Sequence, residues 1–141
     1  GGGVGLASAT DYCFATQFSS IKLSELAIGI GPFVVGPSIE RKIGIAAFSH
    51  LTINATKWHD AEWAKEKNLF AEVYETAEEM DIAILILAKK LSKSNPDSMK
   101  GLKTIMWEGT DHWDDLLIDR AAMSGQWVLS DFTKQTLNKL K

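Results

Sequence analysis

The chain has 141 residues, of which 45% are hydrophobic and 23% are charged, and this composition is typical of a single soluble globular domain. Its net charge of −3 argues against a nucleic-acid surface, which is normally basic. The single cysteine, Cys13, excludes an internal disulfide, and no apolar run has the length of a membrane-spanning helix. We therefore expect a cytoplasmic protein with no membrane partner, and this charge disfavours a nucleic-acid partner.

The first part of the chain predicts one short helix and two strands. A glycine-rich run predicts the helix over residues 3–9. Runs of aromatic and β-branched residues predict the strands over 12–15 and 20–23. The apolar stretch 25–31 is interrupted by glycines, which predicts a loop on a buried surface.

Helix signals dominate the middle of the chain. Pro37 suits the first position of a helix, Gly44 suits a helix end, and Asp60 suits an N-cap. These signals predict helices over 37–44, 45–53 and 61–67, followed by a strand or an extended link over 69–74.

The second half predicts only helices. Thr76 and Glu79 form a capping box that begins a helix to about Ser92. This helix is apolar nearly all round, so we expect it to be buried, either within the protein or between subunits. Cap signals predict three further helices, over 96–108, 111–127 and 131–140.

Two features near the N-terminus are candidates for chemistry. The run Gly1-Gly2-Gly3 precedes a helix, and the unpaired N–H groups at a helix start suit a phosphate or an oxyanion. Glu25 is a single carboxylate in apolar surroundings, where it could transfer a proton. On spacing alone, three glycines in a row more often form a flexible loop, and Glu25 would be an exposed or capping carboxylate.

The two features belong to one longer pattern. A glycine triplet is followed by Leu6, Ala7 and Asp11, then by a strand, and then by Glu25, Gly29 and Pro32. This pattern resembles the crotonase superfamily, the enoyl-CoA hydratase/isomerase proteins. The resemblance continues through residues 41–44 and 59–64 and covers the chain to about Val73.

The resemblance implies an α/β fold of the crotonase type (ClpP/crotonase). Residues 1–74 would be the last portion of its β-β-α superhelix, and residues 75–141 would be a C-terminal helical region that forms a trimer interface. Family members are longer than this chain, so we expect the N-terminal half of the same protein as a partner. We also expect a homotrimer or hexamer, and we expect the 141 residues alone to be inactive.

The resemblance also implies a site for an acyl-CoA thioester. Gly2 would donate one oxyanion-hole N–H, the second donor would come from the missing half, and Glu25 would move the proton. Coenzyme A is part of the substrate, so no separate cofactor and no metal are expected. The further residues expected to contact the substrate are Gly1, Gly3, Gly5, Pro32 and Lys141. Lys134, Lys139 and Lys141 would either contact the CoA phosphates or form a solvated helix end.

Two departures from the family pattern affect the expected reaction. Many hydratases carry a glutamate where this chain has Gly5, and the usual Pro-Gly-Ala-Gly-Gly loop is replaced by residues 32–36. A single glutamate suffices for double-bond isomerisation, whereas the Val4-Gly5 and loop variants resemble methylglutaconyl-CoA-hydratase-like members. We favour a hydratase narrowly. An isomerase and a non-catalytic acyl-CoA-binding or assembly module are the alternatives, and RNA binding, known for some relatives, stays open.

Other chemically interesting residues have simpler interpretations. His50, His59 and His112 lack the spacing of metal ligands, and Cys13 lies in an apolar run that suits a structural thiol. The five tryptophans suit core or interface packing. We find no nucleophile–base pair of the Ser/His/Asp or Cys/His kind.

Overall fold

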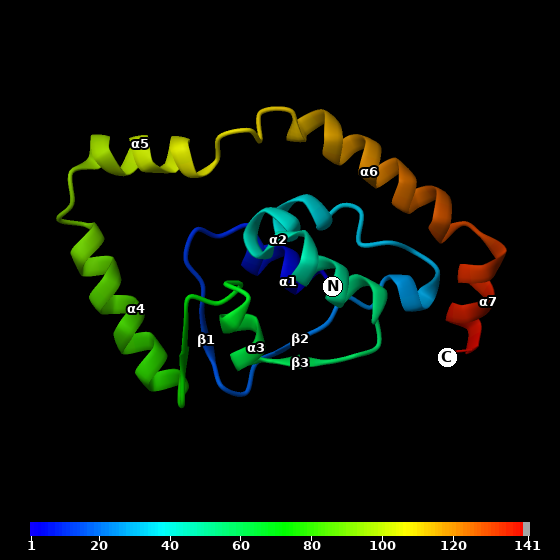
Figure 1. Ribbon diagram of the computed structural model, residues 1–141, viewed down its shortest axis with the longest axis horizontal. Helices are drawn as coiled ribbons and strands as arrows, with labels where there is room; N and C mark the ends of the chain where they lie inside the picture. The colour runs from blue at the N-terminus through cyan, green and yellow to red at the C-terminus, as the bar shows by residue number, and fades with distance from the viewer. Residues whose placement is uncertain (140–141) are drawn as a thin grey trace.

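The computed structural model describes residues 1–139 and consists of a small α/β core and a helical arm (Figure 1). The core elements are α1 (Gly2–Ser8), β1 (Phe14–Thr16), β2 (Ser20–Ile21), the 3₁₀ helix η1 (Leu26–Ile28), α2 (Gly36–Ile53), β3 (His59–Asp60), α3 (Ala61–Glu66) and β4 (Glu72–Tyr74). The arm elements are α4 (Ala77–Leu91), α5 (Pro96–Met106), α6 (Trp113–Val128) and α7 (Asp131–Lys139).

The strands form two small pairs. β1 and β4 are parallel, with Ala15 opposite Val73, and β2 and β3 are antiparallel, with Ile21 opposite His59. The predicted strand 69–74 is shorter in the structure. Its first residues turn inward instead, because the N–H of Leu69 donates to the carbonyl of Ala64, 2.8 Å away.

The helix boundaries largely follow the local signals. Asp60 caps α3 by accepting from the N–H of Trp63 at 2.8 Å, and Thr76 caps α4 by accepting from Glu79 at 3.1 Å. At Gly44, where a helix end was predicted, φ is +75° and ψ is 159°, so the backbone breaks but α2 continues beyond it. A glycine tolerates this left-handed region at little cost.

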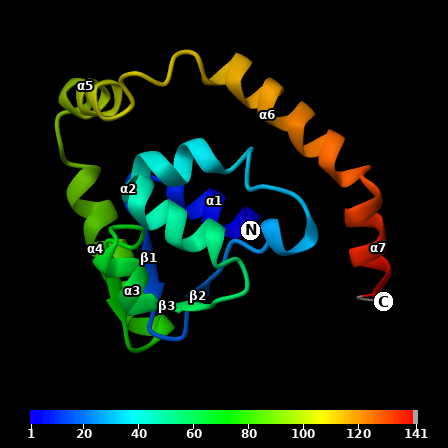
Figure 2. The same cartoon turned by 45° about the vertical axis from the view of Figure 1, so that its right-hand side comes forward.

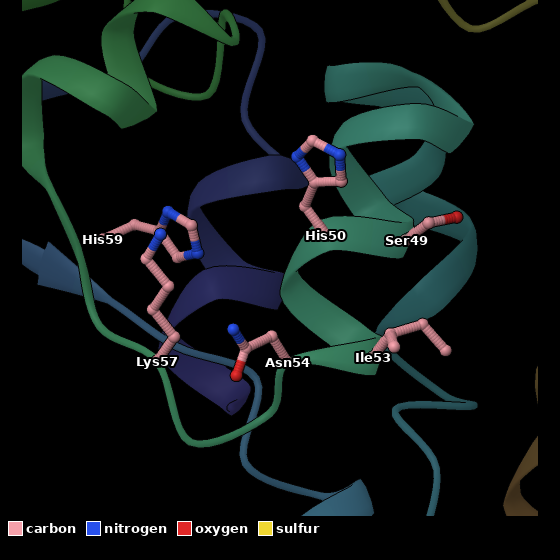
Figure 3. A pocket seen from close by; sticks show the side chains of 6 residues that line it. All are labelled: Ser49, His50, Ile53, Asn54, Lys57 and His59. Atoms are coloured by element: carbon pink, nitrogen blue, oxygen red, sulfur yellow. The ribbon is translucent and has the colours of Figure 1, made fainter.

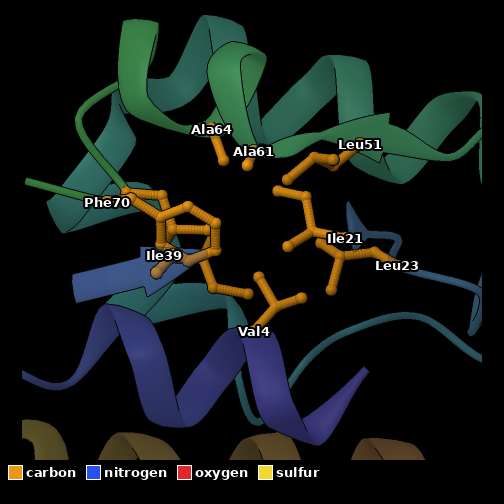
Figure 4. Packing of buried hydrophobic residues seen from close by; sticks show 10 residues of the cluster. Val4, Ile21, Leu23, Ile39, Leu51, Ala61, Ala64 and Phe70 are labelled. Atoms are coloured by element: carbon orange, nitrogen blue, oxygen red, sulfur yellow. The ribbon is translucent and has the colours of Figure 1, made fainter. Parts of the chain in front are cut away.

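One hydrophobic cluster holds the core together (Figure 4). Ile39 and Leu51 of α2 and Leu23 after β2 are at most 1% exposed, and Ala61 and Ala64 of α3 are small enough to bring that helix close to them. The other buried members are Val4, Ala15, Ile21, Leu69 and Phe70. Because α1 and α2 both pack on this cluster, the glycine run is fixed against the core.

The arm curves around the core as an open arc, and both views show it separated from the core over most of its length (Figures 1 and 2). α4, α5 and α6 contain no buried residue. The apolar helix α4 contacts β1 and β4 but leaves Ile82, Leu85 and Ile86 between 51% and 59% exposed. Within this chain α4 is therefore not buried, because nothing covers its outer side.

A polar cluster ties the end of α5 to the core. Asp11 accepts from the ammonium of Lys103 and from the indole N–H of Trp107, both at 2.6 Å. The guanidinium of Arg41 lies over the Trp107 ring at 4.2 Å and donates to the carbonyl of Met106. The pKa of the Asp11 carboxyl is lowered, chiefly by its hydrogen bond from Lys103. The end of α5 is thus attached through charges and aromatic stacking rather than through apolar burial.

Over residues 1–139, the structure contains no helix that is both long enough and apolar enough to cross a membrane.

Candidate active site

The glycine run lies at the start of α1, as the sequence predicted. Gly1 is the N-cap residue, and its carbonyl accepts from the N–H groups of Val4 at 2.9 Å and Gly5 at 3.3 Å. The N–H groups of Gly2 and Gly3 make no hydrogen bond within the described residues, and open space lies where their side chains would be. A cavity of about 350 Å³ adjoins all three glycines. The glycines therefore leave two backbone donors accessible.

Glu25 lies beside the start of α1. It is the N-cap of η1, and its carbonyl accepts from Ile28 at 3.2 Å and Ile30 at 3.0 Å, which holds the residue in place. Its side chain is 22% exposed, and Oε1 lies 4.0 Å from the backbone nitrogen of Gly1. Oε2 is buried and has no hydrogen-bond partner among the described residues. A buried carboxylate oxygen without a donor is able to accept a proton from a bound molecule.

Gly5, one of the predicted substrate contacts, has a packing role. It is buried on the core side of α1, and a Cβ placed on it would lie 2.6 Å from Cγ1 of Val35 and 2.9 Å from its Cβ. Both distances are far shorter than a van der Waals contact. Only glycine therefore fits at position 5 while Val35 keeps its position.

The structure does not bring the remaining predicted contacts to Glu25. Pro32 is buried and lines a different cavity of about 220 Å³, between α2 and Arg120 of α6. Lys134 and Lys139 are exposed on α7. Lys141 lies outside the described residues, so the structure gives no position for it.

Helix α7 returns to the core at η1, a contact that the sequence did not predict. Gly29, which ends η1, has φ of +84°, and a Cβ there would lie 2.5 Å from the Phe132 ring and 2.7 Å from Oγ1 of Thr133. Thr133 is fully buried, and its Oγ1 accepts from Ser130 at 3.1 Å. The sequence predicted a loop over residues 25–31 and carried no signal that Gly29 would meet another helix.

A third pocket lies between the end of α2 and the segment before β3 (Figure 3). It measures about 360 Å³, and its lining includes Ser49, His50, Asn54, Lys57 and His59. The His59 side chain is buried, and burial, followed by the charges of Lys57 and His50, lowers its pKa. No group of three metal-ligating side chains occurs here or elsewhere in residues 1–139.

Comparison with known proteins identifies the family. The family model for enoyl-CoA hydratase/isomerase matches residues 1–133. The chain belongs to the enoyl-CoA hydratase/isomerase family. A curated member of similar sequence is the peroxisomal Δ(3,5)-Δ(2,4)-dienoyl-CoA isomerase of Arabidopsis thaliana, with 32% identity over 110 residues. Since that relative is described as peroxisomal, the cytoplasmic location stays a prediction.

Solved structures of the family confirm the crotonase fold. An enoyl-CoA hydratase/isomerase from Pseudoalteromonas atlantica superimposes with a TM-score of 0.88 at 17% identity, over 99% of this chain. An enoyl-CoA hydratase from Mycobacterium avium superimposes with a TM-score of 0.83 at 26% identity, also over 99% of this chain.

The chain is shorter than these relatives. It covers 38% of the Arabidopsis enzyme and 56% and 54% of the two superimposed chains. The chain therefore spans between about a third and just over half of the length of these relatives. The activity of the whole protein is proposed below.

Proposed function

We propose that the whole protein acts on an enoyl-CoA thioester and uses Glu25 as its single acid and base. The observation that carries this proposal is the buried, unpartnered Oε2 of Glu25 beside the start of α1. Membership of the enoyl-CoA hydratase/isomerase family supports the substrate class.

In this proposal the backbone of α1 stabilises charge. The N–H of Gly2 donates to the thioester oxygen, and the second donor comes from the part of the protein outside this chain. Polarising the carbonyl makes the neighbouring C–H bond more acidic, since negative charge can move onto the oxygen. Loss of one such donor costs about 3 kcal/mol in the activation free energy.

Double-bond isomerisation fits this site better than the hydration that the sequence narrowly favoured. Within 4 Å of the places where side chains on Gly1, Gly2 and Gly3 would begin, the described residues present no carboxylate other than Glu25. One carboxylate can remove a proton from one carbon and return it two carbons away. Hydration also needs a group that activates water, which the rest of the protein would have to supply, so it remains the second candidate.

The proposed assembly is a homotrimer or hexamer that also contains the N-terminal half of each chain. Its support is the apolar surface that α4, α5 and α6 leave open, including Leu85, Ile105 and Ile118 at 59%, 68% and 69% exposure. Contiguous apolar patches on soluble proteins usually mark interfaces when they are large.

The proposal is tested with the full-length protein and its Glu25→Gln variant. A 3-enoyl-CoA and a 2-enoyl-CoA are offered separately, and the conjugated enoyl absorbance is followed together with any hydroxyacyl product. We expect the wild type to generate that absorbance from the 3-enoyl substrate, and Glu25→Gln to lower turnover about 100-fold or more while still binding acyl-CoA.

The matched control is Glu40→Gln, which neutralises an exposed carboxylate on α2 and should leave turnover unchanged. Unchanged turnover in Glu25→Gln would refute the assignment of Glu25. Hydroxyacyl product from the 2-enoyl substrate would establish hydration instead. A wild type that binds acyl-CoA without turnover would be a binding module.

A further inference from the structure

The pocket at the end of α2 is lined from two sides. Ile53 and Asn54 follow His50 by three and four positions, so all three share one face at the end of the helix. Lys57 and His59 line the other side, as Figure 3 shows. The N–H of Lys57 donates to the carbonyl of Asn54 at 3.0 Å, and this turn holds the two sides across from each other.

The same segment separates this pocket from the cavity at the glycine run. Trp58, between Lys57 and His59, lines the glycine cavity instead, with the ammonium of Lys22 over its ring at 4.3 Å. Side chains alternate in this way along an extended chain. The two cavities share no lining residue, so the pocket at the end of α2 is a site of its own.

His59 is the buried polar side chain of the pocket. The residue is 7% exposed, it lies opposite Ile21 in the β2–β3 pair, and its ring packs on Trp63, so the imidazole is held in place. Its Nε2 is buried and has no hydrogen-bond partner among the described residues. Because buried polar atoms in native proteins are nearly always hydrogen-bonded, this nitrogen indicates a partner that binds from outside the described residues.

The pocket has a positive charge and no acidic side chain in its lining. The ammonium of Lys57 is exposed and makes no ion pair among the described residues. The neighbouring carboxylate, Asp60, is engaged as the N-cap of α3. The lining also holds a hydroxyl, an amide and two imidazoles, all of which can donate hydrogen bonds.

We propose that this pocket binds a phosphate group, with Lys57 as its charge partner and His59 as a buried hydrogen-bond donor. An ammonium is a compact charge that suits phosphate, and the neutral donors around it match the several oxygens of a phosphate better than the two of a carboxylate. The volume of about 360 Å³ exceeds that of a bare phosphate, so a phosphate carried on a small organic group also fits.

Binding is measured by calorimetry on the full-length protein with inorganic phosphate, glycerol phosphate and acetate, each at the same ionic strength so that screening stays constant. We expect saturable binding of both phosphates and weaker binding of acetate. Tighter binding of glycerol phosphate would identify a phosphate ester as the ligand, and the reverse order would identify free phosphate. Absence of saturable phosphate binding, or acetate binding as tightly, would overturn the proposal.

Lys57→Met tests the place of binding, because it removes the charge and keeps the length of the side chain. We expect it to weaken phosphate binding about tenfold or more. The matched control is Lys65→Met, which removes an exposed lysine of α3 that does not line the pocket and should leave the affinity unchanged. Equal affinities of the wild type and Lys57→Met would overturn the assignment. No turnover is measured, so the outcome is independent of Glu25.

The imidazole of His59 provides a second readout. Burial, followed by the charges of Lys57 and His50, lowers its pKa, and Asp60 opposes them. A bound phosphate adds negative charge beside the ring, so we expect saturating phosphate to raise the pKa of His59 in an NMR titration, and to raise it less in Lys57→Met. A pKa of His59 that phosphate does not move would place the anion elsewhere and refute the proposed site.

Discussion

Single residues in this structure owe their chemistry to what surrounds them. Glu25 has an unpartnered oxygen because η1 turns it inward, and Gly5 lacks a side chain where Val35 needs the room. His59 is a third case. Its ring is buried and packs on Trp63 with ring centroids 4.1 Å apart, and its Nε2 has no hydrogen-bond partner among the described residues.

His59 should make stability depend on pH. Burial, then the charges of Lys57 and His50, hold the pKa of His59 below its ordinary value of 6.5, and only Asp60 opposes them. The unfolded chain therefore binds a proton at a higher pH than the folded chain does. We expect the free energy of unfolding to fall as the pH decreases below about 6.5, until the folded pKa is passed.

Urea unfolding of the full-length protein at several pH values between about 7.5 and 5 measures this effect. His59→Gln should flatten the dependence on pH, because glutamine does not titrate. His50→Gln is the matched control, since His50 is exposed on the same pocket and should leave most of the dependence in place. Identical profiles for the wild type and His59→Gln would contradict the prediction.

Among the elements, α7 and η1 depend on each other. α7 reaches the core beside η1, and it packs where Gly29 has no Cβ. Three of the four arm helices have side-chain caps of their own: Thr76 for α4, Ser130 for α7 and Asn95 for α5, whose side chain accepts from Asp97 at 2.9 Å and Ser98 at 3.1 Å. α6 begins after His112 without such a cap. Local signals therefore decide where these helices form, but contacts between elements decide where α7 lies.

Gly29→Ala should displace α7. The positive φ alone costs a non-glycine residue about 1–2 kcal/mol, and the new Cβ would meet Phe132 and Thr133. We expect faster hydrogen exchange in residues 131–139 and in η1, with the core helices unchanged. Gly125→Ala in α6 is the control, because nothing lies within 4 Å of its added Cβ. Equal exchange in both variants would refute the proposed dependence.

At the scale of the whole molecule, the core and the arm are stabilised differently. The core buries one cluster of apolar residues around Leu23, Ile39 and Leu51. The arm contacts it at three places, where α4 meets β1 and β4, where the Asp11, Arg41 and Trp107 cluster holds the end of α5, and where α7 meets η1. It leaves most of its own apolar residues uncovered. A protein with this surface is expected to cover it by association.

We predict that the full-length protein is a trimer or hexamer in solution. The physical reason is the burial of the apolar sides of α4, α5 and α6. Each Å² of apolar surface removed from water stabilises the assembly by about 25 cal/mol. Light scattering coupled to size separation measures the molar mass. A monomer at micromolar concentration would refute the prediction.

The sequence by itself determined the elements that local chemistry controls. The caps Asp60 and Thr76 lie where they were predicted, and the backbone breaks at Gly44, where a helix end was predicted, because each depends on contacts within one turn of the chain. The crotonase fold was also predicted, from the combined spacing of the glycine run, Glu25, Gly29 and Pro32, and the family comparisons confirm it.

Only the tertiary structure decided what those residues contact. It placed Glu25 against Gly1, 24 positions away in the sequence, and it placed Pro32 in a cavity apart from both. In the structure Gly5 packs against Val35, and residues of α7 pack against Gly29. These contacts join residues far apart in the chain, and they depend on how helices fill space against each other, which no local pattern encodes.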